Sequence, residues 1–183
     1  LVIKIFNLHK TIHNTMKKLL ILILIVPFFS CETNTIEIEK TAGDWYRGAW
    51  KGKKFQLSDD KYVDLAKKFM DAYENMDPAT MVEMTTDTVK FHPADVAGIF
   101  DVDMTNTDFI VARQAPIDSI NRNYTFLLPI KLEETTSTII ETHFREDRYL
   151  KTGETESVLI FERLIFNADD KINRVVQWMR PVE

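Results

Sequence analysis

The feature that most limits how this chain can fold is a run of four β-rich segments in its second half. They cover about residues 123–133, 137–150, 156–167 and 172–180. Turn sequences of only a few residues separate them, including 151–154 (KTGE) and 167–170 (NADD). Because strands joined by such short turns run antiparallel, the sequence predicts an antiparallel meander.

Two helices are predicted before these strands. Ser58 is a typical N-cap, and apolar residues follow it at helical spacing to about residue 75. Asp77-Pro78 begins a second helix that ends near residue 84, since proline is favoured at the first helical position. Helices followed by a meander indicate an α+β domain, and residues 58–183 suffice for one domain with a core.

The stretch between the helices and the meander is less regular. Residues 88–92 alternate like a strand that ends at Pro93, and 94–106 resemble a loop. Residues 109–122 could form a third helix, with a kink or a new start at Pro116.

The first 30 residues are predicted to be absent from the mature protein. Met16 is followed by two lysines and then by an apolar run that ends at Phe29, which is the pattern of a signal peptide. The run is too short to cross about 30 Å of hydrocarbon as a helix. We therefore interpret 16–30 as a signal peptide and 1–15 as an upstream extension that takes no part in the fold.

Cys31 is the only cysteine of the chain. Residues 28–31 (FFSC) resemble a bacterial lipobox, although phenylalanines stand where leucine and a small residue are usual. A single cysteine after a leader is explained if it carries an anchoring lipid. The alternative is an ordinary secretory signal with an incidental cysteine. Lipid attachment at Cys31 predicts the membrane as a partner and a location in the cell envelope, at the outer membrane of a Gram-negative bacterium.

The predicted mature chain is acidic. Without residues 1–30 it has 19 basic and 28 acidic residues and a formal net charge of −9. An acidic chain without a basic stripe is a poor nucleic-acid binder. It also contains no phosphate loop or nucleotide fingerprint, and its two histidines lie far apart without a spaced metal-ligand partner. We expect no nucleic acid, no cofactor and no metal.

Residues 31–57 are predicted to form a tether and an aromatic arm. The chain is polar to about residue 42, and Trp45, Tyr46 and Trp50 then follow closely. The arm either packs these rings on the domain or serves as a lid or exposed binding surface.

Several motifs in residues 58–183 resemble nuclear transport factor 2-like domains, the SnoaL-like group included. The opening is carried by 69–77 (FMDAYENMD), 81–84 (MVEM) and 88–93 (TVKFHP), and the close by 161–167 (FERLIFN) and 171–180 (KINRVVQWMR). The resemblance implies a cone-shaped α+β fold, in which a curved antiparallel sheet wraps around N-terminal helices and leaves an apolar pocket. It also implies a homodimer through the outer face of the sheet, but no particular activity.

Ketosteroid isomerase, which shares the implied fold, suggests where a site could lie. Its carboxylate base, helix tyrosine and second acid correspond here to His92, Phe69 and Glu162, so the residue types differ and its mechanism is not carried over. Tyr73, one turn beyond Phe69, could supply a hydroxyl to the same pocket. His92 could act as a general base, or it could cap the strand end by bonding a backbone carbonyl.

Alternation along the predicted strands adds further candidates. Glu162 shares a face with apolar residues, so it is either buried, with a raised pKa or a partner, or it lies outside in another register. Arg145 and Arg148 belong to a strand with charges on both faces. Solvated ion pairs are the ordinary outcome there, and contact with an anionic ligand is the alternative.

We expect the domain to bind a small apolar or amphipathic ligand, or a protein partner, without catalysis. Phe69, Phe91 and Trp178 are the candidate pocket-lining residues, although Trp178 also suits a core or a dimer interface. The alternative is a small-molecule isomerase or hydro-lyase with His92 as general base beside Tyr73 or Glu162. Catalysis requires those three side chains to converge in one cavity, and binding requires a cavity of roughly a few hundred Å³.

Overall fold

A computed structural model of the protein describes residues 41–182. The predicted extension, signal peptide, Cys31 lipid site and most of the tether lie outside the described residues. Within residues 41–182, no helix is long and apolar enough to cross a membrane.

The domain is built on one eight-stranded sheet with the strand order β1-β2-β5-β6-β7-β8-β3-β4. The strands are β1 (Thr41–Asp44), β2 (Lys54–Leu57), β3 (Thr85–His92), β4 (Phe100–Asp103), β5 (Ile117–Leu132), β6 (Thr138–Leu150), β7 (Thr155–Phe166) and β8 (Ile172–Pro181). Strands β5 to β8 form the predicted antiparallel meander, whereas β3 pairs with β8 in parallel. The sheet is therefore mixed rather than wholly antiparallel.

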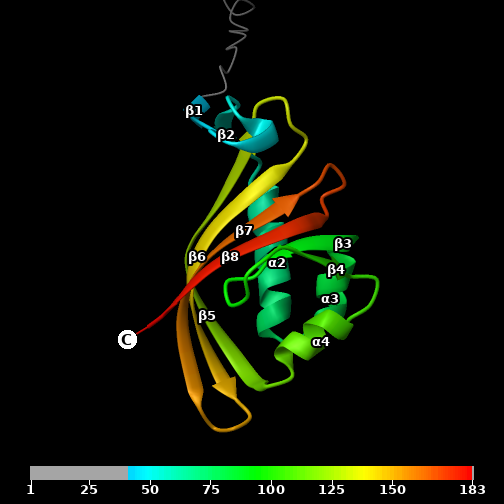
Figure 1. Ribbon diagram of the computed structural model, residues 1–183, viewed down its shortest axis with the longest axis vertical. Coiled ribbons are helices and arrows are strands. Elements are labelled where there is room, and N and C mark those ends of the chain that lie inside the picture. The colour runs from blue at the N-terminus through cyan, green and yellow to red at the C-terminus, as the bar shows by residue number, and fades with distance from the viewer. Residues whose placement is uncertain (1–40, 183) are drawn as a thin grey trace, which may run out of the picture. The chain divides into compact units, whose positions relative to one another are not determined.

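Three α-helices lie on the inner side of the curved sheet (Figure 1). They are α2 (Lys61–Glu74), α3 (Pro78–Glu83) and α4 (Asp108–Gln114), and a 3₁₀ turn, η2 (Gly48–Trp50), lies in the arm. The predicted α+β class, with a curved sheet around N-terminal helices, is confirmed.

Helix α2 begins three residues after the predicted cap. The Ser58 hydroxyl lies 3.0 Å from the Thr138 hydroxyl and its backbone N–H bonds Pro129, so Ser58 joins the chain to the sheet. The Asp59 carboxylate accepts a hydrogen bond from the Lys61 N–H at 2.8 Å instead.

Two segments differ from the sequence predictions in type. The predicted loop 94–106 contains β4, which pairs with β3. The predicted helix 109–122 ends at Gln114, before Pro116, and its second half is the start of β5. Proline ends the helix there, and pairing with β6 determines the conformation that follows.

The aromatic arm belongs to the same sheet as the domain. Strand β2 pairs with the last residues of β5, and β1 pairs with β2. The Trp45 ring contacts Trp50 and Phe55, and the Arg163 guanidinium lies 5.2 Å from its centroid. Tyr46 remains exposed.

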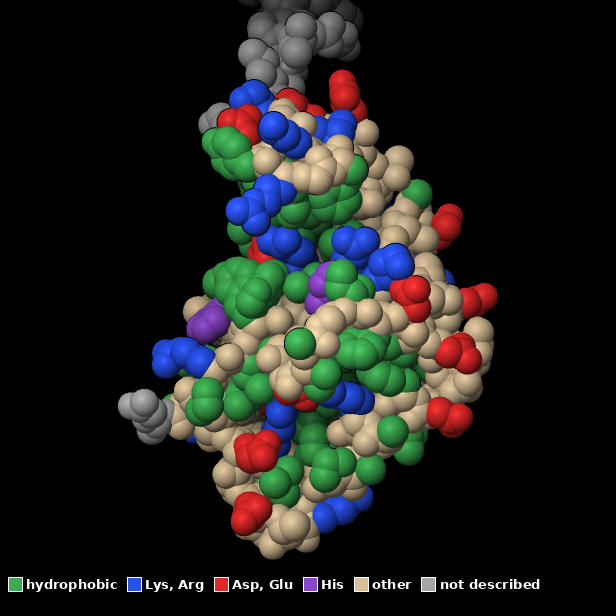
Figure 2. Space-filling model, viewed as in Figure 1, with side chains coloured by type: hydrophobic (Ala, Val, Ile, Leu, Met, Phe, Trp, Pro, Cys, Tyr) green, Lys and Arg blue, Asp and Glu red, His purple; other side chains and the backbone are tan. Residues whose placement is uncertain are grey.

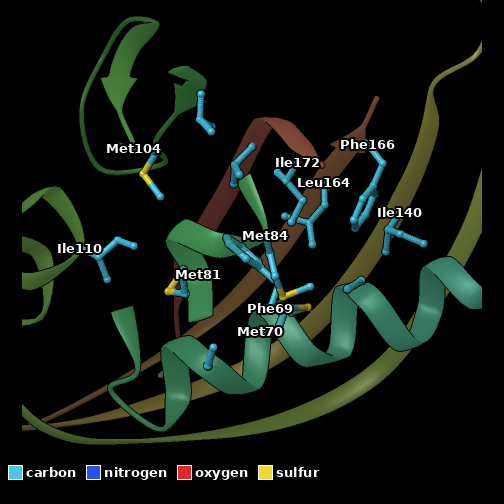
Figure 3. Close-up of a cluster of buried hydrophobic side chains, with 14 of the residues drawn as sticks. Phe69, Met70, Met81, Met84, Met104, Ile110, Ile140, Leu164, Phe166 and Ile172 are labelled. Atoms are coloured by element: carbon cyan, nitrogen blue, oxygen red, sulfur yellow. The ribbon is translucent and has the colours of Figure 1, made fainter. Parts of the chain in front are cut away.

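The core lies between the helices and the inner face of the sheet. Figure 3 shows Phe69 and Met70 of α2 together with Met81 of α3, facing Ile140, Leu164, Phe166 and Ile172 from the strands. Complete burial of such side chains stabilises the fold by roughly 1.5–3 kcal/mol each. The cavity described below lies beside this core and shares Phe69, Met81 and Ile110 with it.

Candidate ligand-binding cavity

A cavity of about 90 Å³ lies between the helices and the inner face of the sheet. Its wall is mostly apolar, and charged side chains from β5, β6 and β7 form one part of it. Nine helices and strands contribute to the lining, which includes Phe69, Met81, Val89, Phe91, Met104 and Ile110 on the apolar side.

The cavity is smaller than binding was expected to require. Sites for drug-sized ligands usually enclose about 300–1,000 Å³. A dry cavity of roughly 150 Å³ can hold benzene, so the enclosed space here suits a group smaller than benzene. A larger ligand would have to project through the open side.

Arg122, Glu146 and Arg148 form a buried charge network in the polar part of the wall. Arg122 Nε donates to Glu146 Oε2 at 2.7 Å, and Arg122 Nη2 lies 2.6 Å from the same oxygen. Arg148 Nε donates to Glu146 Oε1 at 2.6 Å. One carboxylate is thus shared by two guanidinium groups.

The surroundings hold this network in its charged form. Burial alone would raise the pKa of Glu146, but Arg122 and Arg148 outweigh burial and leave the pKa below its usual value. The pKa of Arg122 is raised despite burial, chiefly because Glu146 and Glu162 favour its charged form. Arg122 Nη1 also donates to the Met70 carbonyl at 3.1 Å, which ties β5 to α2.

Glu162 lies in the same wall and is 3% exposed. Its Oε2 accepts a hydrogen bond from Gln177 Nε2 on β8 at 2.5 Å. Burial raises its pKa, Arg122 and Gln177 oppose that shift, and Glu146 adds to it, so the net direction is upward. Of the two alternatives for Glu162, the structure has the buried one, with both a raised pKa and a partner.

Tyr73 also lines the cavity, beneath the charge network. The Arg122 guanidinium lies 4.7 Å from the centroid of its ring. Burial and the nearby Glu146 carboxylate raise the pKa of the Tyr73 hydroxyl. Tyr73 and Glu162 therefore share one cavity, and the pKa of each is raised.

His92 does not line the cavity, which corrects the candidate catalytic set. Phe91 points inward from β3, and strand alternation turns His92 to the other face, where its Nε2 is buried without a hydrogen-bond partner. Burial lowers the pKa of His92, and Arg174 and Lys90 lower it further. His92, Tyr73 and Glu162 therefore do not converge in one cavity.

The remaining candidates divide between the two faces of the sheet. Phe69 and Phe91 line the cavity, whereas Trp178 is 49% exposed and packs against Phe161 on the outer face. Arg148 reaches the cavity. Arg145 is on the outer face, where it pairs with Asp147.

Comparisons with known proteins identify the fold. No family model matches the sequence, and no curated protein matches it either. Among solved structures, the Kfla4162 protein of Kribbella flavida is similar at a TM-score of 0.54 and 12% identity, over 67% of this chain and 90% of the other. A protein assigned as a SnoaL-like polyketide cyclase in Shewanella denitrificans gives 0.51 and 9%, over 67% and 92%. One assigned as an isomerase in Bacillus subtilis gives 0.51 and 17%, over 67% and 88%.

The domain has the SnoaL-like, nuclear transport factor 2-like fold. The predicted resemblance is thus confirmed at the level of the fold, and identities this low carry no residue roles from one protein to another.

Sequence reasoning missed the centre of the polar wall in this SnoaL-like domain. Arg122 lies at the end of a predicted helix, and Glu146 lies in a predicted strand with charges on both faces, where solvated ion pairs are the ordinary expectation. The sequence did contain one signal for Glu146. Thr142, Phe144, Glu146 and Arg148 alternate along one strand, so all four lie on the same face as the inward-pointing Phe144.

Among residues 41–182, no group of three acidic, histidine or cysteine side chains is placed to hold a metal ion.

Proposed function

We propose that the SnoaL-like domain binds a small amphipathic molecule in its cavity, without catalysing a reaction. The observation that carries the proposal is the division of the wall into an apolar part and a buried polar part. Such a division orients a ligand whose ends differ in polarity, because burying an unpaired polar group costs free energy. The small enclosed volume limits the buried part of the ligand to a few heavy atoms.

Two adjacent valines of β8 provide a matched test. Val175 lines the cavity, and Val176 is the next residue and belongs to the other face. Val175→Phe should fill the cavity and abolish binding of small amphipathic probes in ligand-observed NMR, whereas Val176→Phe should leave binding unchanged. Equal binding by both variants would contradict the proposal.

Proton-transfer catalysis is the second candidate, and Glu162 supports it. A buried carboxyl group with a raised pKa can act as an acid or base near neutral pH. An isomerase or hydro-lyase of this kind would use Glu162 with Tyr73, not His92. If a substrate is found, Glu162→Gln should abolish turnover and leave substrate binding intact, while His92→Gln should retain turnover.

We also propose that the protein is anchored in the cell envelope through a lipid on Cys31. The proposal rests on the signal-peptide pattern of residues 16–30 and on the single cysteine that follows it. Mass spectrometry of protein purified from the envelope should find an acylated N-terminal Cys31. Cys31→Ser should release the domain from membranes, and a membrane-bound Cys31→Ser protein would refute the anchor.

A homodimer through the outer sheet face is a further proposal. Phe126, Phe161 and Trp178 form neighbouring ring contacts there, and each is more than a third exposed. Figure 2 shows other hydrophobic side chains exposed between charged ones on one face. Trp178→Ser should convert a dimer to a monomer in sedimentation experiments, and a monomeric native protein would refute the dimer.

A further inference from the structure

Building on the proposed binding function, we propose that the cavity selects a small carboxylate anion. Arg148 holds the carboxylate head, and the apolar wall receives the tail. Three features of the described residues support this: the different hydrogen bonding of Arg122 and Arg148, the place of Arg148 in the walls of two hollows, and the surroundings of Glu162.

The two guanidinium groups of the charge network differ in how many of their N–H donors have a hydrogen-bond partner. Arg122 uses Nε and Nη2 on Glu146 and Nη1 on the Met70 carbonyl. Arg148 uses Nε on Glu146, but among residues 41–182 its Nη1 meets only Glu156 Oε2, at 3.8 Å, and its Nη2 only Met179 Sδ, at 4.0 Å. Donors of a charged, 19% exposed side chain are thus left for another acceptor. A carboxylate suits the pair, because its two oxygens match the two Nη groups.

Arg148 also belongs to the walls of two hollows. A second, smaller hollow adjoins the cavity and shares Arg113, Arg148 and Gln177 with it. Arg113 Nη1 donates to Asp95 at 3.2 Å, and its guanidinium lies 5.5 Å from the Phe91 ring. Two guanidinium groups therefore line both hollows. Asp95 and Glu146 each take up only part of their donors, and the remaining donors favour an anion over a cation.

The surroundings of Glu162 also bear on the ligand. No arginine or lysine among the described residues lies within salt-bridge distance of its carboxyl group, and its only hydrogen bond among them is from Gln177. Burial raises the pKa of this carboxyl, and the protonated form of a carboxyl donates a hydrogen bond. A protonated Glu162 would add a donor for the bound carboxylate, whereas an ammonium ligand would meet Arg113, Arg122 and Arg148.

The size and lining of the cavity limit the tail to a short apolar chain. Phe69, Met81, Val89, Met104 and Ile110 provide contacts without hydrogen-bonding groups, apart from the weak thioether acceptors. Because the enclosed volume is less than that of a benzene-binding cavity, a tail of a few carbons fits inside. A longer acid would need to extend through the entrance.

The decisive experiment compares butanoate, 1-butanol and butylamine, which share a four-carbon skeleton and differ in the polar group at its end. Ligand-observed NMR titrations of the native protein at pH 7 should show butanoate binding about 10-fold or more tightly than either other probe, since charge-assisted hydrogen bonds distinguish it. Equal binding of acid and alcohol, or a preference for the amine, would overturn the anion proposal while leaving ligand binding intact. Failure of all three probes to bind would overturn both proposals.

A matched pair of arginine variants locates the head group. Arg148→Gln should reduce the preference for butanoate over 1-butanol to within about threefold, because the free Nη donors are lost. Arg145→Gln, on the same strand but the opposite face, should keep the native preference. Arg148→Lys should keep part of it, since it retains the charge and loses the paired donors. If a folded Arg148→Gln protein kept the native preference, the assignment of the carboxylate head to Arg148 would be wrong. If that variant fails to fold, the probe series on the native protein still decides whether the cavity prefers an anion.

Discussion

At the scale of single residues, Arg122 is the side chain on which the interior most depends. It is 5% exposed and is joined to the 1% exposed Glu146, to the Met70 carbonyl and to the rings of Tyr73 and Phe144. Its attraction to Glu146 offsets the large cost of removing both charges from water. Removing Arg122 would leave the buried Glu146 carboxylate with Arg148 as its one remaining partner among the described residues.

Arg122→Met should therefore destabilise the domain by about 3–5 kcal/mol, as urea denaturation would measure. Arg145→Met is the control, because Arg145 pairs with Asp147 on the exposed outer face and its loss should matter much less. A loss of stability for Arg122→Met as small as that of the control would show that the buried network is dispensable.

The contribution of Glu162 to the stability of the fold should depend on pH with the opposite sign to that of an ion-paired carboxylate. Burial raises the pKa of this carboxyl in the folded protein, whereas its pKa in the unfolded chain is about 4.3. The stability from this group is full below the unfolded pKa and is lost as pH rises through the folded pKa. Its charged or titratable neighbours in the cavity wall are Arg113, Arg122, Glu146, Arg148 and Tyr73.

Glu162→Gln should accordingly stabilise the domain at pH 8 more than at pH 4, relative to the native protein. Urea midpoints at the two pH values measure the difference. Glu156→Gln, at an exposed carboxyl, should show no comparable change between them. The same effect of Glu162→Gln at both pH values would mean that the native carboxyl is not held protonated.

At the scale of elements, the hairpin turns determine the register of the meander. In the turn between β6 and β7, Gly153 has φ +89°, and its N–H donates to the Leu150 carbonyl at 2.9 Å. This left-handed conformation strains any residue with a Cβ, although open space surrounds the position. The cost of a substitution there is therefore conformational and does not come from a clash.

Gly153→Ala should destabilise the domain by about 1 kcal/mol in thermal or urea denaturation. Thr152→Ala in the same turn should have a smaller effect, because it requires no unusual backbone conformation. If the two variants behaved alike, the strain argument would be wrong.

At the scale of the whole molecule, the core cluster draws its buried side chains from Tyr62 to Val175. Strands β1 and β2 contribute little to that core, but β2 covers the edge of β5 and Trp45 packs beside Arg163. An uncovered strand edge exposes unpaired backbone groups to other chains. The arm thus belongs to the fold chiefly as the edge of the sheet.

A chain that begins at position 31 with Cys31→Ser and one that begins at Thr41 both retain strands β1 and β2 and serve as references. A chain that begins at Ser58 should be less stable and should self-associate, since it leaves the end of β5 unpaired. Light scattering and urea denaturation of the three proteins measure both effects. Equal behaviour of the 41 and 58 chains would show that the arm is not needed to cover the edge.

The sequence by itself determined the features that depend on local patterns of neighbouring residues. Alternation and short turns predicted the meander from β5 to β8, and the apolar spacing of residues 62–73 predicted α2. The motifs of residues 69–93 and 161–180 predicted the SnoaL-like fold, which the solved structures confirm. In each case the information lies in neighbouring residues, which set a period or a turn.

What only the tertiary structure decided depends on which strands become neighbours. Parallel pairing of β3 with β8 turns Phe91 into the cavity and His92 away from it, and pairing of β5 with β6 makes residues 117–122 a strand. That pairing also brings Arg122 against Glu146, 24 residues away along the chain. Alternation along one strand can indicate the face on which a residue lies, but the shared carboxylate and the partners that shift each pKa arise from such long-range contacts.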